Sequence, residues 1–302
     1  KSISALVDYS IKGIENKTSY NYEPHIIDDD LRSLTDKVDL LLAGPPCQGH
    51  SNLNNKTRGD DPRNNLYLDV ISIGVAVRAK KIIIENVQTI KAGKQNVVNI
   101  GIKILKQYNY QCTECVINAD DIGGGQSRIR HFLIASLNGK PNSSLILDNI
   151  NRPKLTLGNL LELEPIISIS ENLLRPGDYS VENISRINYL FDNDLYELPD
   201  HERPDCHKDG DHNRAAVYGR LYWDKPSPTI TTGYMSPGRG RYIHPKERRA
   251  LIPHEAARIQ GFPDSFQFNG ASPVKLAKWI GDAVPFCLSY TSTLIALSTD
   301  FI

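Results

Sequence analysis

The sequence predicts an α/β fold with a second, smaller domain, and two patterns lead to this prediction. Through the first third of the chain, apolar strand-like runs alternate with stretches of helical periodicity, which favours right-handed βαβ units and a mostly parallel sheet. Residues 38–43 and 81–87 are apolar at nearly every position, as is typical of strands buried on both faces. The alternation ends near residue 136, where asparagine, serine and proline become frequent and indicate a domain boundary.

The elements of the first third follow one another at short spacing. The run at 38–43 stops at Gly44-Pro45-Pro46, and apolar residues then recur at helical spacing between 64 and 80. We therefore expect strands at 4–7, 38–43, 81–87, 110–118 and 131–135, helices at 64–80 and 96–108, and a loop at 120–130.

The second half gives weaker local signals. The periodicity over 155–197 is too irregular to assign elements, and the polar stretch 198–214 predicts a surface loop rich in His and Asp. Near the end, 274–297 is expected to form a pair of helices around Gly281-Asp282-Ala283-Val284-Pro285.

The composition is that of an ordinary globular protein. The 302 residues include 35 Lys and Arg against 35 Asp and Glu, so the formal net charge is zero, and 40% of the residues are hydrophobic. No continuous apolar run approaches the ~18 residues of a membrane span, so no membrane partner is expected. Five cysteines are too few for a disulfide framework and suit a reducing compartment.

Three chemically active groups are expected at one edge of the sheet. Asp8, the turn containing Cys47, and Glu85 each end a predicted strand, and ligands of parallel sheets bind at the carboxyl ends of the strands. Two prolines stiffen the turn before Cys47, which suits a nucleophile held in one orientation. Cys47 could equally be a small apolar residue in a tight turn, and Glu85 could cap the next helix.

Two arginines follow a glycine-rich turn and enter the last predicted strand of this part. Arg128 and Arg130 are two residues apart, so a continuous strand would present both on the same face, where they could hold one anionic or carbonyl-rich ligand. The alternative is a solvated strand edge.

The ordered set Pro-Pro-Cys-Gln, Glu-Asn-Val and Gln-x-Arg-x-Arg resembles the DNA (cytosine-5)-methyltransferase family. The resemblance extends to further segments along nearly the whole chain, apart from about 136–215. These segments are Asp30-Leu31, Arg63-Asn64-Asn65-Leu66, the Lys225–Thr231 stretch, the Glu255–Pro263 stretch and Gly281–Pro285.

The resemblance implies a Rossmann-like S-adenosylmethionine-dependent methyltransferase sheet with a smaller target-recognition domain. It places the last helices back on the first domain, giving a catalytic, cofactor-binding domain of 1–135 plus 272–302 and a target-recognition domain of 136–271. It further implies methyl transfer to carbon 5 of a cytosine flipped out of duplex DNA, with Cys47 forming a covalent adduct. By the same resemblance Glu85 holds the edge of the base, Arg128 binds its O2, and Arg130 helps to orient Glu85.

The family resemblance also implies S-adenosyl-L-methionine as cofactor. The expected contacts are Asp8, Tyr9, Asp30, Leu31, Pro46, Leu66, Asp282, Ala283 and Val284. The family usually has Asn at the position of Asp282, so a carboxylate there changes both charge and hydrogen-bonding capacity. The family's first βα unit, with its glycine-rich turn, does not precede Asp8, which indicates a truncated record, a second polypeptide that supplies the segment, or a chain that does not bind the cofactor.

Double-stranded DNA is the expected partner despite the zero net charge, because basic residues gather in the second half, with no acid between Lys225 and Lys246. The expected DNA contacts are Gln48, Ser51, Arg58, Arg214, Arg220, Thr231, Thr232, Arg239 and Arg241.

Three alternatives accompany this interpretation. A tRNA cytosine-5 methyltransferase is one, although the Cys-Phe-Thr signature of that branch does not occur, and a non-catalytic DNA-binding subunit is another. Cys112 and Cys115 have zinc-like spacing, with Cys206, His201, His207 and His212 as further ligands, but ordinary packing is favoured and no metal is expected. A bacterial cytoplasmic or nucleoid-associated location follows from the family.

Overall fold

The structure is a computed structural model that describes residues 7–9, 24–26, 28–46, 65–92, 96–164, 167–208 and 216–300. The chain divides into two compact units. The first unit comprises 1–117, 129–151 and 290–302, and the second comprises 118–128 and 152–289. Residues 118–128 and 272–289 therefore group with the second unit and 136–151 with the first, unlike the predicted boundaries. The functional assignment of the two domains stays a prediction.

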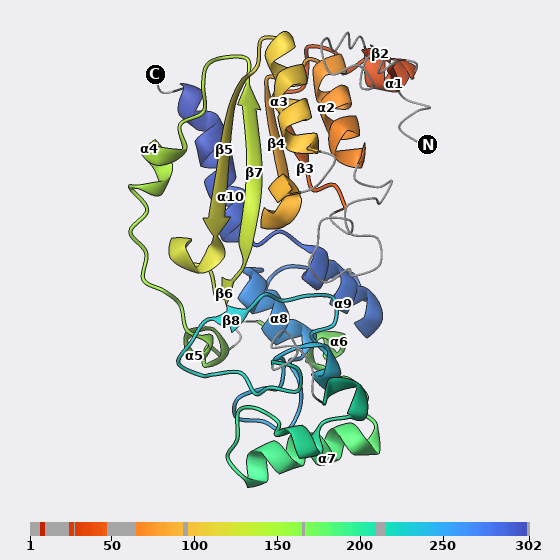
Figure 1. The fold of residues 1–302 in the computed structure, drawn as a ribbon, viewed down its shortest axis with the longest axis vertical. Helices are drawn as coiled ribbons and strands as arrows, with labels where there is room; N and C mark the ends of the chain where they lie inside the picture. Colours follow the sequence, from red (N-terminus) through yellow and green to blue (C-terminus); the bar gives the residue numbers. More distant parts are fainter. Residues whose placement is uncertain are drawn as a thin grey trace. The chain divides into compact units, whose positions relative to one another are not determined.

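The first unit contains a four-stranded sheet with the order β3-β4-β7-β5 (Figure 1). Its strands are β3 (Leu40–Ala43), β4 (Lys81–Val87), β5 (Gln111–Asn118) and β7 (Ile129–Ser136). β3 and β4 are parallel, whereas β4 and β7 are antiparallel, and the arrows of β7 and β5 also point in opposite directions in Figure 1. β3, β4 and β5 therefore run in one direction, as a mostly parallel sheet predicts, and β7 runs against them, because it enters the sheet between β4 and β5 without a crossover helix after β5.

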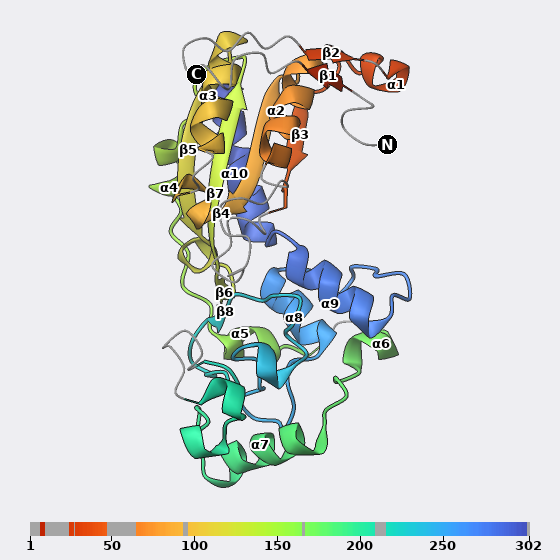
Figure 2. The ribbon, with the colours of Figure 1, turned by 45° about the vertical axis from the view of Figure 1, so that its right-hand side comes forward.

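Helices cover both faces of this sheet (Figures 1 and 2). α2 (Leu66–Ala76) and α3 (Val97–Gln107) lie on one face, and the part of α10 (Phe286–Leu297) that belongs to the first unit lies on the other. Alternate strand residues, such as Ile84 and Leu133, enter the core beneath α2 and α3 together with the fully buried Ile71 and Leu105. The period of two along β4 and β7 thus decides which side chains face which helical layer. α4 (Ser143–Leu147) follows β7.

The first described strands form a separate ladder. β1 (Val7–Tyr9) pairs antiparallel with β2 (Pro24–Ile26), with Asp8 opposite His25, and α1 (Asp29–Arg32) follows. Figures 1 and 2 show these three elements at the end of the unit where β3 begins. The expectation that Asp8 shares the carboxyl edge with Glu85 is therefore wrong, because that rule applies to parallel strands of one sheet, whereas among the described strands β1 pairs with β2 in a separate antiparallel ladder.

The second unit is mainly helical, and it includes the region 155–197 that the sequence left unassigned. Its helices are α5 (Leu157–Leu161), α6 (Glu171–Leu174), α7 (Val181–Asp192), α8 (Pro253–Gln260) and α9 (Pro273–Asp282), and its strands are β6 (Gln126–Ser127) and β8 (Ser227–Pro228). The core contains the fully buried Leu157, Ile230 and Ile280. β6 and β8 pair in parallel and so join segments a hundred residues apart.

The predicted helix pair at the end of the chain is confirmed as α9 and α10. Within the described part of the chain, the combined stretch Pro273–Asp300 is long and apolar enough to cross a membrane by length and composition, and 44% of its most apolar window is buried. α9 ends at Asp282 and α10 begins at Phe286, and Ile280, Leu288 and Ile295 are fully buried. This burial is typical of core helices in a globular protein.

Candidate active site

The carboxyl end of β4 holds an ion pair. Glu85 Oε1 lies 2.8 Å from Arg130 Nε, and the side chains of Glu85 and Arg130 are 15% and 14% exposed. Val87 pairs with Arg130 in the antiparallel ladder, so Arg130 enters the sheet at the strand end that carries Glu85. The pairing expected between Arg130 and Glu85 is therefore present, and charge-assisted bonds of this kind hold a carboxylate in one orientation.

The neighbouring residue Asn86 holds the turn after β3. Its Nδ2 donates to the carbonyl oxygen of Pro45 over 3.1 Å, and its Oδ1 accepts from the backbone N–H of Val87 over 2.9 Å. Asn86 is 2% exposed. Pro45 lies two residues before Cys47, so this buried amide fixes the start of the segment that carries the predicted nucleophile. Asn86 was not among the predicted site residues, although it stands within Glu-Asn-Val.

A second residue that the sequence did not single out is His131, which pairs with Asn86 across β4 and β7 and is completely buried. Its Nε2 lies 3.0 Å from Glu114 Oε1, which is also 3.2 Å from Lys91 Nζ. Burial lowers the pKa of His131, partly opposed by the Glu114 carboxylate. The neutral ring therefore donates from Nε2 to Glu114, and this pair anchors the strand position beside Arg130. No sequence pattern marks a single buried histidine of this kind.

Arg128 belongs to the second unit, unlike Arg130. The strand is interrupted at Arg128, because β6 pairs with β8 and β7 pairs with β4. The expectation that both arginines share one face of a continuous strand is therefore wrong. Arg128 is 5% exposed, and its Nη1 donates to the carbonyl oxygen of Ile230 over 2.9 Å.

Several predicted site residues lie outside the described part of the chain, namely Cys47, Gln48, Ser51, Arg58 and Arg214. The side chains of Asp8 and Tyr9 also lie outside it. Their predicted roles stay predictions.

The other predicted cofactor residues are spread over several elements. Leu66 begins α2, and since α2 leads back to the start of β4, Leu66 lies toward the carboxyl end of β3, where Pro46 is exposed. Asp30 and Leu31 lie in α1, and Leu31 packs against the core.

The turn after α9 carries the last three predicted cofactor contacts. Ala283 and Val284 are half-buried. Asp282 is exposed, and its Oδ2 lies 2.5 Å from Lys278 Nζ. The carboxylate is therefore not buried in the turn, and it pairs with Lys278 at the surface.

Two of the arginines expected to contact DNA are used inside the second unit. Arg220 is 6% exposed, stacks between the rings of Phe191 and Tyr196, and donates to the carbonyl oxygen of Pro245 over 2.9 Å. Arg241 donates to the carbonyl oxygen of Arg220 over 2.9 Å and pairs with Glu197 at 2.5 Å. The prediction of both as phosphate contacts is therefore corrected, because their guanidinium groups are already bonded within the protein.

The remaining described DNA-contact candidates differ in exposure. Arg239 and Thr232 are exposed, whereas Thr231 is half-buried and its Oγ1 lies 3.0 Å from Tyr242 Oη. Of the predicted basic contacts in the described part of the chain, Arg239 is the one that remains accessible.

The metal alternative gains no support from the groups that are close together. Within the described residues, His244, Glu247 and Glu255 form a cluster of three possible ligands, but Arg249 pairs with both carboxylates at 2.8 and 2.6 Å. Cys112 and Cys115 are free thiols, and burial raises their pKa values to about 11 and about 12. Protonated thiols of this kind are poor metal ligands.

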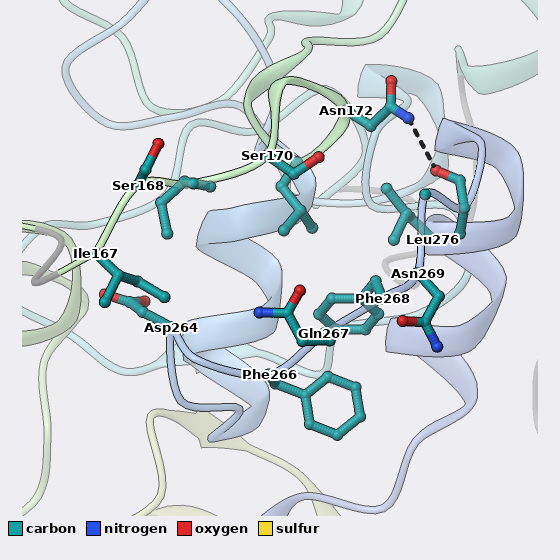
Figure 3. A pocket seen from close by; sticks show the side chains of 14 residues that line it. Ile167, Ser168, Ser170, Asn172, Asp264, Phe266, Gln267, Phe268, Asn269 and Leu276 are labelled. Carbon is teal, nitrogen blue, oxygen red and sulfur yellow. Dashed lines mark hydrogen bonds between the residues drawn. The ribbon is translucent and has the colours of Figure 1, made fainter.

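A cavity of about 260 Å³ lies in the second unit between the segments 167–173 and 264–276. Figure 3 shows Ser168 and Ser170 on the first segment and Gln267 and Phe268 on the second, which lies across from it. Asn172 Nδ2 donates to the carbonyl oxygen of Ala271 over 3.4 Å and ties the segments together. None of the predicted site residues lines this cavity.

Comparison with known proteins gives concordant matches. The model of the C-5 cytosine-specific DNA methylase family matches residues 14–291. The Type II methyltransferase M1.BsuMI of Bacillus subtilis is 42% identical over 265 residues, which is 85% of this chain and 60% of that protein. The Type II methylase M.HgiDII of Herpetosiphon aurantiacus is 28% identical over 82% of this chain and 73% of its own length. The chain thus spans three fifths to three quarters of these relatives.

Two solved structures share the fold. The Entamoeba histolytica methyltransferase EhMeth superposes with a TM-score of 0.56 at 20% identity, over 91% of this chain and 80% of that one. The S. pombe Dnmt2 methyltransferase gives a TM-score of 0.57 at 17% identity, over 90% and 83%. These neighbours agree with a Rossmann-like methyltransferase sheet. Since the family model covers nearly the whole chain, this protein belongs to the C-5 cytosine-specific DNA methylase family.

Proposed function

We propose that this protein transfers a methyl group from S-adenosylmethionine to carbon 5 of a cytosine in duplex DNA, through a covalent adduct with Cys47. The observation that carries the proposal is the end of β4, where Glu85 is paired with Arg130 at 2.8 Å while Asn86 holds Pro45, two residues before Cys47. A carboxylate and a cysteine-bearing turn held at one strand end suit attack on a base and stabilisation of its edge.

The proposed reaction follows from the need to make carbon 5 nucleophilic. The target base is flipped out of the duplex, because carbon 6 cannot be reached within the stack. The Cys47 thiolate forms a bond to carbon 6, and the negative charge spreads toward N3 and O2 of the ring. Glu85 holds the N3 and amino edge, and the guanidinium of Arg128 holds O2. After carbon 5 has gained its methyl group, its proton leaves and the carbon–sulfur bond breaks.

The described residues partly fit the methyl donor. Leu66, Ala283 and Val284 are half-buried and apolar, and Pro46 is exposed, so these residues suit contact with the uncharged parts of an adenosine-type ligand. Asp8 and Asp30 rest on the family resemblance alone. S-adenosylmethionine, when bound, supplies an electrophilic methyl group.

The family model supports a DNA substrate. M1.BsuMI is a Type II methyltransferase and M.HgiDII is a Type II methylase, and we infer that this chain acts in a comparable restriction-modification setting in the bacterial cytoplasm. Exposed Arg239 and Thr232 are the proposed DNA contacts among the described residues. No observation supports a second polypeptide.

Methyl transfer to duplex DNA, read by bisulfite sequencing with and without Cys47→Ser, tests the function. The expected result is that the wild-type protein makes cytosines at specific sites resistant to bisulfite conversion, and that this resistance is lost in the variant. DNA carrying 5-fluorocytosine should trap the wild-type protein covalently, because the fluorine cannot leave as the carbon-5 proton does.

Three outcomes would contradict the proposal. Methylation that persists in the serine variant would refute the nucleophile, and methylation confined to tRNA would favour the RNA alternative. DNA binding without cofactor binding or trapping would favour a non-catalytic subunit.

A further inference from the structure

Two buried glutamines join three separate segments of the second unit. Gln126 Nε2 donates to Gln260 Oε1 over 2.8 Å and lies 3.3 Å from the carbonyl oxygen of Ile259. Both glutamines are 1% exposed. Gln126 lies in β6, and Gln260 is the last residue of α8, so a single amide pair connects the start of the Gln-x-Arg-x-Arg segment to the helix that precedes Gly261.

The connection continues from Gln126 to Arg128. The backbone N–H of Ile230 donates to Gln126 Oε1 over 3.0 Å, and the carbonyl oxygen of the same residue accepts from Arg128 Nη1 over 2.9 Å. Ile230 is completely buried. The backbone N–H and C=O of Ile230, within the Pro-Thr-Ile-Thr stretch, therefore link the side chain of Gln126 to the guanidinium of Arg128.

The connection also continues from Gln260 to the turn after α9. Gln260 Nε2 donates to the carbonyl oxygens of Ile280 and, over 3.4 Å, of Ala283. The backbone around Gly281 approaches Thr231 and Thr232 so closely that a Cβ on Gly281 would overlap their main chain. The three segments consequently cannot shift independently without breaking buried hydrogen bonds or overlapping backbone atoms.

We propose that Gln126 and Gln260 are positioning residues that couple the Ala283 turn to the Arg128 guanidinium, so that occupancy of the cofactor site and capture of the base favour each other. The inference rests on the proposed function, which assigns Ala283 to the cofactor and Arg128 to the base. Along this path every step is a hydrogen bond between groups that are buried or half-buried, so a displacement of the turn changes the position of the arginine.

The reciprocal nature of coupling defines the measurement. Calorimetry gives the affinity of S-adenosylhomocysteine with and without saturating duplex DNA, and the ratio of the two affinities is the coupling factor. We expect a factor within the roughly 5–150-fold range of such couplings in the wild-type protein. Gln260→Met keeps the length of the side chain but removes the donor and the acceptor, so the factor should fall toward 1 and kcat should fall more than KM rises.

A conservative variant separates positioning from loss of folding. Gln260→Glu keeps the acceptor for Gln126 but faces the Ile280 and Ala283 carbonyls with a second oxygen. Burial among carbonyls raises the pKa of such a carboxyl. Its protonated form donates again, so the coupling factor should recover as the pH falls. Tyr179→Phe is the matched control, because it removes a hydroxyl that accepts from the Ala250 N–H over 3.0 Å elsewhere in the unit.

The outcomes distinguish this inference from the proposed function. A wild-type protein that methylates DNA but binds the two ligands independently overturns the coupling alone. A folded Gln260→Met protein with the wild-type coupling factor also overturns the coupling. The same holds if Tyr179→Phe reduces the coupling factor as much as Gln260→Met does. A wild-type protein without methyl transfer refutes the proposed function, and the inference fails with it.

Discussion

At the residue scale, successive residues at the end of β4 point to opposite faces of the sheet, so Glu85 and Asn86 bind different partners. Glu85 faces the same side of the sheet as its ladder partner Phe132, and its carboxylate pairs with Arg130. Asn86 points to the opposite side and holds Pro45. One residue of offset therefore supplies a charged group and a neutral amide to different parts of one site.

Replacing Arg130 by Gln tests whether the ion pair orients Glu85. We expect kcat for methyl transfer to fall by about 10²-fold, because a carboxylate without its partner no longer holds one orientation. Quenched-flow single-turnover kinetics measure the rate of methyl transfer in both proteins. The control is Arg78→Gln, whose partner Asp36 lies at 2.9 Å on an exposed surface, with side chains 67% and 66% exposed. Equal kinetics in both variants would contradict the role of Arg130.

His131 makes the stability of the first unit depend on pH. Burial lowers its pKa below the ordinary value of 6.5, so the unfolded chain binds this proton more readily than the folded one. The contribution of neutral His131 to the free energy of unfolding is therefore complete above pH 6.5, and it decreases as the pH falls below 6.5. Urea unfolding at pH 8 and pH 5 should show a larger loss of unfolding free energy for the wild-type protein than for His131→Gln. Identical pH dependence in the two proteins would show that folding does not lower the pKa of His131.

At the scale of elements, ion pairs of largely half-buried residues hold both ends of α8. Arg249 pairs with Glu255 in the first turn, and Arg258 in the last turn pairs with Asp264 at 2.6 Å. His254 Nε2 lies 2.8 Å from the same Asp264 carboxylate. The hydrogen bond from Arg258 is the main cause that lowers the pKa of Asp264 to about 2. This network holds the helix whose last residue is Gln260.

The Asp264 pairing predicts an acid-sensitive contribution to stability. A carboxyl with a folded pKa of about 2 against an ordinary 3.8 contributes on the order of 2 kcal/mol above pH 4, and this contribution is lost as the pH falls from about 4 to 2. Asp264→Asn should therefore lower the unfolding free energy at pH 7 and have less effect at pH 3, measured by urea titration. Asp282→Asn, at an exposed pair, should change it by less than about 1 kcal/mol. A pH-independent effect of Asp264→Asn would contradict the assignment.

At the scale of the whole molecule, some arginines of this chain with zero net charge are bonded within the protein, whereas others are exposed to solvent. Arg220 and Arg241 stabilise the second unit from within, through aromatic stacking and carbonyl oxygens. Arg239 is exposed and free to meet solvent or a phosphate. A cluster of basic residues in the sequence thus overstates the charge that is available to DNA.

This difference predicts two kinds of arginine variant. Arg239→Ala should reduce the slope of log affinity against log salt concentration by about 1, because one phosphate contact is lost. Arg241→Ala should leave that slope unchanged and instead lower the melting temperature. Fluorescence anisotropy over a salt series, with thermal unfolding of each variant, measures both. A folded Arg241→Ala protein with a reduced slope would restore Arg241 as a phosphate contact.

The elements of the first unit were largely predictable, whereas their arrangement was not. Hydrophobic runs located β3, β4 and β5, and helical spacing located α2 and α3, because burial leaves a local pattern. The direction of β7 depends on its pairing with β4, and the separation of β1 from the sheet depends on its pairing with β2. Neither pairing leaves a pattern within the strand itself.

The sequence by itself determined the family, the order of its motifs and the chemistry of the candidate groups Cys47, Glu85, Arg128 and Arg130. The tertiary structure decided that Arg130 pairs with Glu85, that Arg128 is held by Ile230, that Arg220 is buried, and that Arg241 is bonded within the protein. The physical reason is that residue type and local periodicity report what a side chain can do. Its hydrogen-bond partners can lie more than a hundred residues away, as Gln260 does from Gln126, and they come together only once the chain has folded.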